Sequence, residues 1–307
     1  MLVPGVVGRL HEASDMAFKK ILCPIDFSSG SKHAMRVALR VANEADAELV
    51  LAHVWHLPPL AVTSELPLPA DTIQRMIADE ERGLAQALEE ALAYGAKRVT
   101  ARFLTGLPWS EIVEAVEQDP AFDLIVIGTH GRTGLARVLL GSVAEKVVRH
   151  APCPVLATRP PGGIEPFDRV LVPIDFSASS QRATQLAARM VKPGGHITLL
   201  HVIEVPVTFS GELPEDVLLE HIDRRASEYV ERVATKLRSE TAGSVETQTR
   251  VGHPGAQTLL VLAEQLAYDL VVMGSHGRTG IMRVLLGSVA EKIVRHAHCP
   301  VLVERAR

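Results

Sequence analysis

The strongest constraint on this chain is that most of its sequence occurs twice. Residues 274–301 repeat residues 128–155 at a distance of 146 positions, with five mismatches. Upstream, residues 170–177 (VLVPIDFS) repeat residues 21–28 (ILCPIDFS) at a distance of 149 positions. A repeat of this length has the size of a domain, and 307 residues suffice for two domains of ~150 residues. The sequence therefore predicts a tandem duplication of one domain rather than a solenoid of short repeats.

A segment rich in proline and glycine separates the two copies. Neither a helix nor a central strand continues through Pro160–Gly163 and the following Pro166. The expected organisation is an N-terminal tail over 1–15, a first domain over 16–159, a linker over 160–166 and a second domain over 167–307. The tail has no counterpart in the second copy. It is interpreted as disordered, or as translated from a start codon upstream of Met16.

Each copy alternates short apolar runs with helical patterns. Apolar runs rich in branched residues predict buried strands, and apolar spacings of three and four predict the helices between them. The strands are expected at 21–25, 49–54, 99–104, 124–127 and 155–158, and again at 170–174, 197–202, 245–250, 270–273 and 301–303. This alternation predicts an α/β fold with two tandem open parallel five-stranded sheets, Rossmann-like, with helices on both faces.

A glycine pattern follows the fourth strand of both copies. It reads Gly-x2-Gly-x9-Gly-Ser and consists of Gly128, Gly131, Gly141 and Ser142, then of Gly274, Gly277, Gly287 and Ser288. Directly after a strand, we expect the first glycine to permit positive φ and close approach of a ligand to the backbone. The last Gly-Ser pair precedes a helix, whose unpaired N–H groups and partial positive charge favour phosphate. The pattern therefore predicts a phosphate site.

The same residues have a structural alternative. Ser142 with Glu145, and Ser288 with Glu291, fit the S-x-x-E capping box, and glycines also serve in tight turns. Two observations favour binding: the loop between the glycines carries two arginines in each copy, and an acid ends the first strand in each copy.

Those acids are Asp26 and Asp175, which follow the first strand at the same carboxyl edge of the sheet. A carboxylate there can accept hydrogen bonds from ribose hydroxyls, and the alternative is a helix cap or a turn. The acid and the glycines line one crevice when strand one neighbours strand four, which requires the order 3-2-1-4-5. We expect Pro24 and Pro173 to form an apolar wall of this crevice.

With these features together, each copy resembles a universal stress protein domain of the subfamily marked by Gly-x2-Gly-x9-Gly-Ser/Thr. The two complete motifs and the two Pro-x-Asp-Phe-Ser strand ends carry the resemblance, which covers nearly all of the chain after residue 15. It implies a stress-response protein that binds ATP or AMP without a P-loop, with Mg²⁺ as a candidate companion of the phosphates. It also implies that strands 155–158 and 301–303 pair across a two-fold axis within the chain as a pseudo-dimer, and it leaves a homodimer open.

The resemblance carries the family's binding residues over to both copies. Asp26 and Asp175 would hold the ribose, and the backbone of Val54 and Val202 would pair with the adenine edge. The phosphates would lie among Gly128, Gly131, Gly141, Ser142 and Val143 in the first copy, and among Gly274, Gly277, Gly287, Ser288 and Val289 in the second. Further candidate contacts in the same loops are His130, Arg132, His276 and Arg278. For the two histidines, a solvent-exposed turn is an equal alternative.

Other reactive side chains are interpreted as structural. Strand alternation turns His53 and His201 away from the adenine contact, so we expect them to pack. Cys153 and Cys299 are expected as small buried residues rather than metal ligands, and Cys23 has a valine as its counterpart. We expect no metal site and no catalytic residue.

Composition narrows the partners. Lys+Arg 32 against Asp+Glu 36 gives a net charge of -4, without the basic field that wraps nucleic acid. Three cysteines favour a reducing cytosol, and no apolar run approaches the ~18 residues of a membrane span. We expect a cytoplasmic protein whose partners are an adenine nucleotide and an unidentified protein, with neither nucleic acid nor membrane.

The sequence favours a nucleotide-binding regulatory module, because no residue pair is placed like a general base on a water or hydroxyl. The alternative is a slow ATPase or autophosphorylating enzyme, with phospho-acceptors among Thr129, Thr133, Ser142 and Ser288. A third hypothesis is a dimeric scaffold whose motifs are vestigial.

Overall fold

A computed structural model of the chain describes residues 18–57, 68–129, 140–204, 215–252, 255–276 and 286–305. The first half contains strands β1 (Lys20–Pro24), β2 (Glu48–Trp55), β3 (Val99–Thr105), β4 (Leu124–Gly128) and β5 (Val155–Thr158), and helices α2 (Ser29–Ala45), α3 (Ala70–Ala93), α4 (Pro108–Gln118) and α5 (Ser142–His150). The second half contains strands β6 (Phe167–Pro173), β7 (Val191–Ile203), β8 (Ser244–Val251), β9 (Leu270–Gly274) and β10 (Val301–Glu304), and helices α6 (Ala178–Met190), α7 (Glu215–Glu240), α8 (Gly255–Gln265) and α9 (Ser288–His296). The expected alternation of strands and helices is present in both halves.

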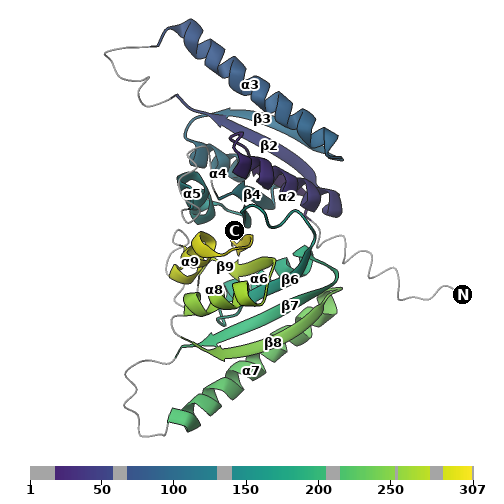
Figure 1. The fold of residues 1–307 in the computed structure, drawn as a ribbon, viewed down its shortest axis with the longest axis vertical. Helices are drawn as coiled ribbons and strands as arrows, with labels where there is room; N and C mark the ends of the chain where they lie inside the picture. Colours follow the sequence, from purple (N-terminus) through teal and green to yellow (C-terminus); the bar gives the residue numbers. More distant parts are fainter. Residues whose placement is uncertain are drawn as a thin grey trace, which may run out of the picture.

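The strands form one sheet, in the order β3-β2-β1-β4-β5-β10-β9-β6-β7-β8. Each half is parallel and has the predicted order 3-2-1-4-5, with its first strand between its second and fourth. The two halves meet where β5 and β10 pair antiparallel, with Leu302 opposite Leu156. The two expected sheets are therefore joined edge to edge through their last strands, as the resemblance implied. The molecule is elongated, with α3 near one end and α7 near the other (Figure 1).

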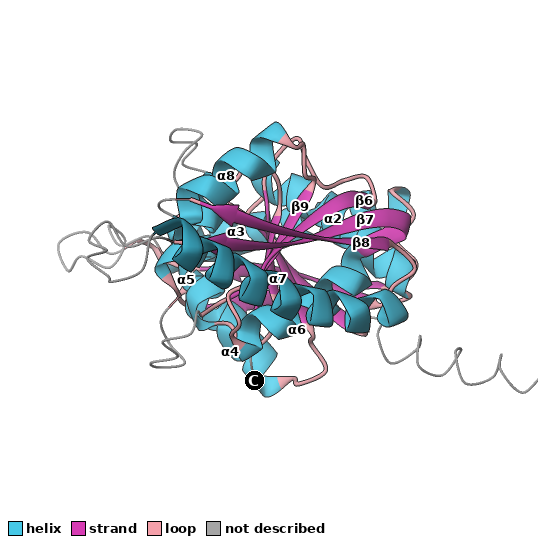
Figure 2. Cartoon of the chain, turned by 90° about the horizontal axis from the view of Figure 1, so that it is seen from below, coloured by secondary structure: helices cyan, strands magenta, loops and turns pink. Residues whose placement is uncertain are grey.

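Helices cover both faces of the sheet (Figure 2). Successive strand residues point to opposite faces, so Ile21 packs in one apolar core and Leu22 in the other. The first core lies under α2, α3, α6 and α7, and the second under α4, α5, α8 and α9. Each core contains residues of both halves, and Leu156 and Leu302 at the joint are fully buried. The two halves therefore share their hydrophobic interior.

Local signals explain several helix boundaries. Helices α2 and α6 begin after Ser28 and Ser177, whose hydroxyls accept the backbone N–H groups of residues 31 and 180. Pro108 opens α4, as predicted for a first helical position. Gly95 follows the end of α3 with φ 88°, a conformation that glycine adopts without strain.

The joint between the halves is also held by arginines that reach across it. Arg40 of α2 lies over the ring of Phe167, 4.4 Å from its centroid, and Arg189 of α6 lies over the ring of Phe18 at 3.7 Å. Arg189 also contacts the carboxylate of Asp123, with 3.4 Å between nitrogen and oxygen. The exchange is reciprocal, as two-fold related halves require.

The described helices include none with the length and low polarity needed to span a membrane. The segment Pro160–Gly163, part of the predicted linker, forms a turn, and the carbonyl of Gly162 accepts a hydrogen bond from His33 Nε2 at 2.7 Å. Residues 1–15, expected as a tail, lie outside the described residues.

Candidate functional site

The acids that follow β1 and β6 form the first part of the candidate site. Asp26 Oδ1 accepts hydrogen bonds from the Ser28 backbone N–H at 3.1 Å and from the Ser28 hydroxyl at 2.6 Å. Asp175 Oδ1 accepts the same two bonds from Ser177, at the same distances. The serines, not the acids, cap the following helices. Both aspartates therefore form a turn, and in Asp175 these bonds use Oδ1 rather than Oδ2.

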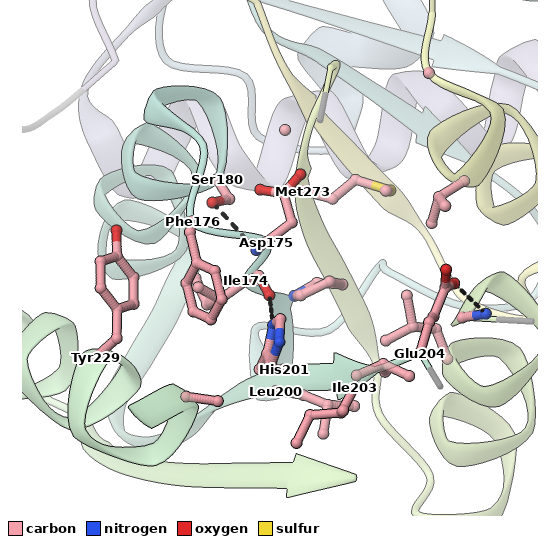
Figure 3. A pocket seen from close by; sticks show the side chains of 18 of the residues that line it. Ile174, Asp175, Phe176, Ser180, Leu200, His201, Ile203, Glu204, Tyr229 and Met273 are labelled. Carbon is pink, nitrogen blue, oxygen red and sulfur yellow. Dashed lines mark hydrogen bonds between the residues drawn. The ribbon is translucent and has the colours of Figure 1, made fainter. Parts of the chain in front are cut away.

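The residue after each acid has an unusual backbone. Phe27 has φ 65° and Phe176 has φ 68°, a region that bulky residues rarely adopt and that costs on the order of 1 kcal/mol. The ring of Phe176 stacks on His201, with 4.3 Å between centroids, and meets the edge of Tyr229 at 4.5 Å. His201 Nδ1 donates to the carbonyl of Ile174 at 2.6 Å. These contacts fix the chain beside Asp175 (Figure 3).

The corresponding histidine of the first half is packed in the same way. His53 is 4% exposed, stacks on Phe27 with 4.5 Å between centroids, and bonds the carbonyl of Ile25 at 2.9 Å. His53 packs as predicted, whereas His201 packs on Phe176 but is only half-buried and also lines the second-half cleft described below.

The glycines that end β4 and β9 are required by packing, and the predicted positive φ is wrong. Gly128 and Gly274 are strand residues, and neither has positive φ. A Cβ on Gly128 would lie 2.8 Å from the carbonyl oxygen of Gly30, at the start of α2. A Cβ on Gly274 would lie 2.5 Å from the hydroxyl of Ser179, at the start of α6. The absence of a side chain at these glycines lets a helix start lie against the strand end.

A hydrogen bond joins the two ends of each glycine-rich loop. The Gly141 N–H donates to the carbonyl of Thr129 at 2.7 Å, and the Gly287 N–H donates to the carbonyl of Ser275 at 2.8 Å. The start of α5 therefore lies next to the end of β4, and the start of α9 next to the end of β9. His130, Gly131, Arg132, Gly277 and Arg278 lie in these loops, outside the described residues.

The expected capping boxes are not formed. Gly141 and Gly287 are the N-cap residues, with extended backbones, so Ser142 and Ser288 are the first helical residues and provide no side-chain cap. In α9 the first intrahelical bond runs from the Glu291 N–H to the Gly287 carbonyl. The N–H groups of residues 288–290 therefore come before the first intrahelical donor. Such amides, together with the helix dipole, favour an anion.

In the second half these features surround one cleft of about 910 Å³. The predicted residues that line it are Pro173, Asp175, Val202, Gly274, His276, Gly287, Ser288 and Val289. They are all of the second-half predictions that the structure describes. The volume lies within the range of small-molecule sites, ~300–1,000 Å³. Figure 3 shows Asp175 and Met273 on one side of the cleft and Glu204 on another.

Other residues of the cleft were missed from the sequence. Phe176 and Tyr229 line the cleft but were not predicted. The Asp-Phe-Ser sequence that occurs in both copies was a signal for Phe176. Arg225 and Arg232 line the cleft from exposed positions on α7, where nothing in the helical pattern distinguishes them from a solvated face. Glu204 accepts the Gly255 N–H at 2.7 Å and so caps α8.

His276 lines the same cleft and is held by its neighbour. Its Nδ1 lies 3.0 Å from the hydroxyl of Ser275. Burial, and to a lesser extent the charge of Arg305, lowers the pKa of His276, while Glu304 acts in the opposite direction. The imidazole is therefore biased towards its neutral form.

The first half places its predicted residues on the equivalent elements. Pro24 ends β1 with Asp26 two residues later, Val54 lies in β2, and Gly128 ends β4. Gly141, Ser142 and Val143 form the start of α5. The matching order of strands in both halves gives these residues the same arrangement along the sheet edge.

The cysteines are buried in apolar surroundings, as predicted. Burial raises the pKa of the Cys23 and Cys299 thiols to about 12, so neither is a reactive thiolate at neutral pH. Within the described parts of the chain, no group of three or more His, Cys, Asp or Glu residues is arranged to hold a metal ion.

The fold and the cleft together define a class of protein: a tandem α/β protein with a candidate ligand cleft at the switch point of the second parallel half-sheet. The universal stress protein family model matches residues 17–159 and again residues 166–305. The chain therefore belongs to the universal stress protein family, with two copies of the family's domain in tandem.

Individual relatives agree with this assignment. A universal stress protein of Methanocaldococcus jannaschii is 40% identical over 161 residues, which cover 51% of this chain and 91% of that protein. A universal stress protein of Mycobacterium bovis is 30% identical over 292 residues, 90% of this chain and 94% of that protein. The crystal structure of a universal stress protein from Archaeoglobus fulgidus matches with a TM-score of 0.68 and 26% identity, covering 94% of this chain and 98% of that one.

Proposed function

We propose that this universal stress protein is a regulatory module that binds one adenine nucleotide, ATP or AMP, in each half. The observation that carries the proposal is the cleft of the second half, which is lined by the predicted acid, by Gly274 and Gly287 and by the start of α9. We further propose that the protein consists of a tail over 1–15, two domains over 16–159 and 167–307, and a linker over 160–166.

The cleft offers each part of a nucleotide a chemically suitable partner. The phosphates meet the N–H groups at the start of α9, contributed by Ser288 and Val289. The ribose hydroxyls donate to the carboxylate of Asp175, whose Oδ2 lies outside the turn bonds to Ser177. The adenine lies against Pro173 and pairs with the backbone of Val202.

The first half carries the same chemistry and we assign it a second site. Its residues are Pro24, Asp26, Val54, Gly128, Gly141, Ser142 and Val143, with His130, Gly131 and Arg132 in the loop, and Gly277, His276 and Arg278 complete the second loop. Any Mg²⁺ would bind mainly to the phosphates of the nucleotide, because each proposed site has backbone amides and one carboxylate rather than a full set of metal ligands. We propose that the protein acts in the cytoplasm, where nucleotide binding regulates its interaction with a protein partner.

Proline substitution tests the amides directly. Proline removes a backbone N–H yet is favoured at the first helical position, and the extended backbones of Gly141 (φ -63°, ψ 144°) and Gly287 (φ -62°, ψ 148°) suit a following proline. The variant Ser142→Pro with Ser288→Pro should therefore fold normally. It should bind ATP about tenfold more weakly at each site, because a hydrogen bond to a charged group is lost.

The matched control is Ser142→Ala with Ser288→Ala, which keeps both N–H groups. Isothermal titration calorimetry of the two variants against wild type separates the amide from the hydroxyl. Equal ATP affinity in the proline variant and wild type would exclude the helix starts as the phosphate sites.

A further inference from the structure

Two arginines and two glutamates form a closed ring between α5 and α9. Arg149 lies 3.3 Å from Glu145 of its own helix and 3.8 Å from Glu291 of the other. Arg295 lies 3.2 Å from Glu291 and 3.6 Å from Glu145. Each glutamate gives one oxygen to the arginine of its own half and the other oxygen to the arginine of the other half. These four residues are called the interhelix ring below, and α5 and α9 lie on either side of the joint (Figure 1).

The ring lies close to both proposed phosphate positions. Glu145 and Glu291 are in the first turns of α5 and α9. At a rise of 1.5 Å per residue, each lies about 4.5 Å along the axis from the first helical residue. The ring side chains are 27–35% exposed, so water screens them only partly. A charge at either helix start therefore acts on the ring directly.

A second set of contacts holds each helix to the opposite half. Arg159, after β5, donates to the carbonyls of Ala297 and Arg295 at the end of α9, both at 2.9 Å. Arg305, after β10, donates to the carbonyl of Ala151 at the end of α5, at 3.1 Å. Each helix that begins at one site thus ends in hydrogen bonds to an arginine of the other half.

From this geometry we propose that the interhelix ring couples the two nucleotide sites, so that occupation of one weakens binding at the other. The proposal rests on the proposed function, since it needs a polyphosphate at the start of each helix. A polyphosphate at the start of α5 repels Glu145 and attracts Arg149 and Arg295. Glu291 then loses part of its neutralisation, and its charge disfavours a second polyphosphate at the start of α9. Linkage makes the effect equal in the other direction.

The expected weakening is about two- to fivefold, the range that partly exposed ion pairs provide. ATP should show a larger effect than AMP, because its phosphate chain carries more negative charge. The coupling should also diminish at high ionic strength, since salt screens charges at the protein surface.

A thermodynamic cycle measures the coupling with the full-length protein. Titration of the Gly287→Val variant with ATP gives the affinity of the first site while the second is closed, and Gly141→Val gives the reverse. In wild type, the overall association constant for two ATP molecules equals the product of these two single-site association constants multiplied by the coupling factor. A factor of about 0.2–0.5 in wild type is expected.

Two ring variants test the route of the coupling. Arg149→Gln with Arg295→Gln should return the factor to one, and so should Glu145→Gln with Glu291→Gln. The glutamine-for-glutamate pair should also tighten both sites, because a like charge near each phosphate is removed. The matched control is Lys146→Gln with Lys292→Gln, which removes the same number of positive charges from the same helices outside the ring and should leave the factor unchanged.

The outcomes separate this inference from the function on which it rests. A wild-type factor of one, with both sites binding, overturns the coupling alone. A factor below one that persists in both ring variants overturns the ring as its route. Absence of ATP binding in wild type overturns the proposed function and the inference with it.

Discussion

Replacing Gly128 by alanine should destabilise the protein even when no nucleotide is present. The added Cβ would lie 2.8 Å from the carbonyl oxygen and 2.9 Å from the carbonyl carbon of Gly30, and 3.2 Å from the backbone nitrogen of Ser31. Because these are backbone atoms at the start of α2, no rotamer change relieves the contacts. Overpacking of this kind costs ~1–3 kcal/mol, and the reduced freedom of the unfolded chain offsets ~0.4–1 kcal/mol of it. We expect a net loss of about 1–2 kcal/mol.

Thermal unfolding followed by circular dichroism tests this value in nucleotide-free protein. At ~2–4 °C per kcal/mol, the expected loss of about 1–2 kcal/mol lowers the melting temperature by about 2–8 °C. Gly162→Ala is the control, since its Cβ would meet the side-chain Cδ of Pro300 at 3.3 Å and no backbone atom closer than 4.0 Å, so the loss of stability should be smaller than for Gly128→Ala. A Gly128→Ala protein that melts with wild type would refute the packing explanation and return this glycine to a role in ligand approach.

Three further predictions concern binding and pH. Gly141→Val with Gly287→Val should abolish nucleotide binding but keep the far-ultraviolet circular dichroism spectrum, because the new Cβ atoms fill the phosphate approach; normal ATP titration of a folded variant would contradict this. Asp175→Asn should keep the turn, since an amide oxygen can still accept from Ser177, but lower ATP affinity at the second site about tenfold through the lost charge, as a titration in the Gly141→Val background would report. Burial lowers the pKa of His33 below its ordinary 6.5, assisted by the charge of Arg36 and opposed by the bond to the Gly162 carbonyl, so the unfolded chain binds this proton more readily. The contribution of His33 to stability is therefore lost as pH falls below about 6.5. In the His33→Gln variant, the free energy of unfolding in urea should change less between about pH 7 and pH 5.5 than in wild type. An equal change in both proteins would assign the pH dependence to other groups.

The repeat is the reason that so much of the fold followed from the sequence. The same strand–helix pattern occurs in both copies, so each copy supports the assignment of the other. Asp26 and Gly128 can line one crevice only if strand one lies beside strand four, and this condition predicts the strand order 3-2-1-4-5. That order is present in both halves. The pairing of β5 with β10 followed from the family resemblance, whereas apolar patterning alone does not choose which edges meet.

The errors have physical causes at the helix starts and strand ends. The S-x-x-E pattern at Ser142 suggested a capping box, but the extended Gly141 is the N-cap. Glu145 instead pairs with Arg149 and with Arg295 of the other half, a partner that no local pattern reveals. Positive φ was predicted for the strand-end glycines and is absent, and the helix start that packs against each of them is a tertiary contact that no local pattern shows.

The central claim is that each half holds one adenine nucleotide against the start of α5 or α9. Calorimetric titration of the wild-type protein with ATP, beside Gly287→Val, tests it most directly. Two nucleotides should bind per chain in wild type and one in the variant. Absence of binding heat at millimolar ATP, or an unchanged stoichiometry in the variant, would contradict it.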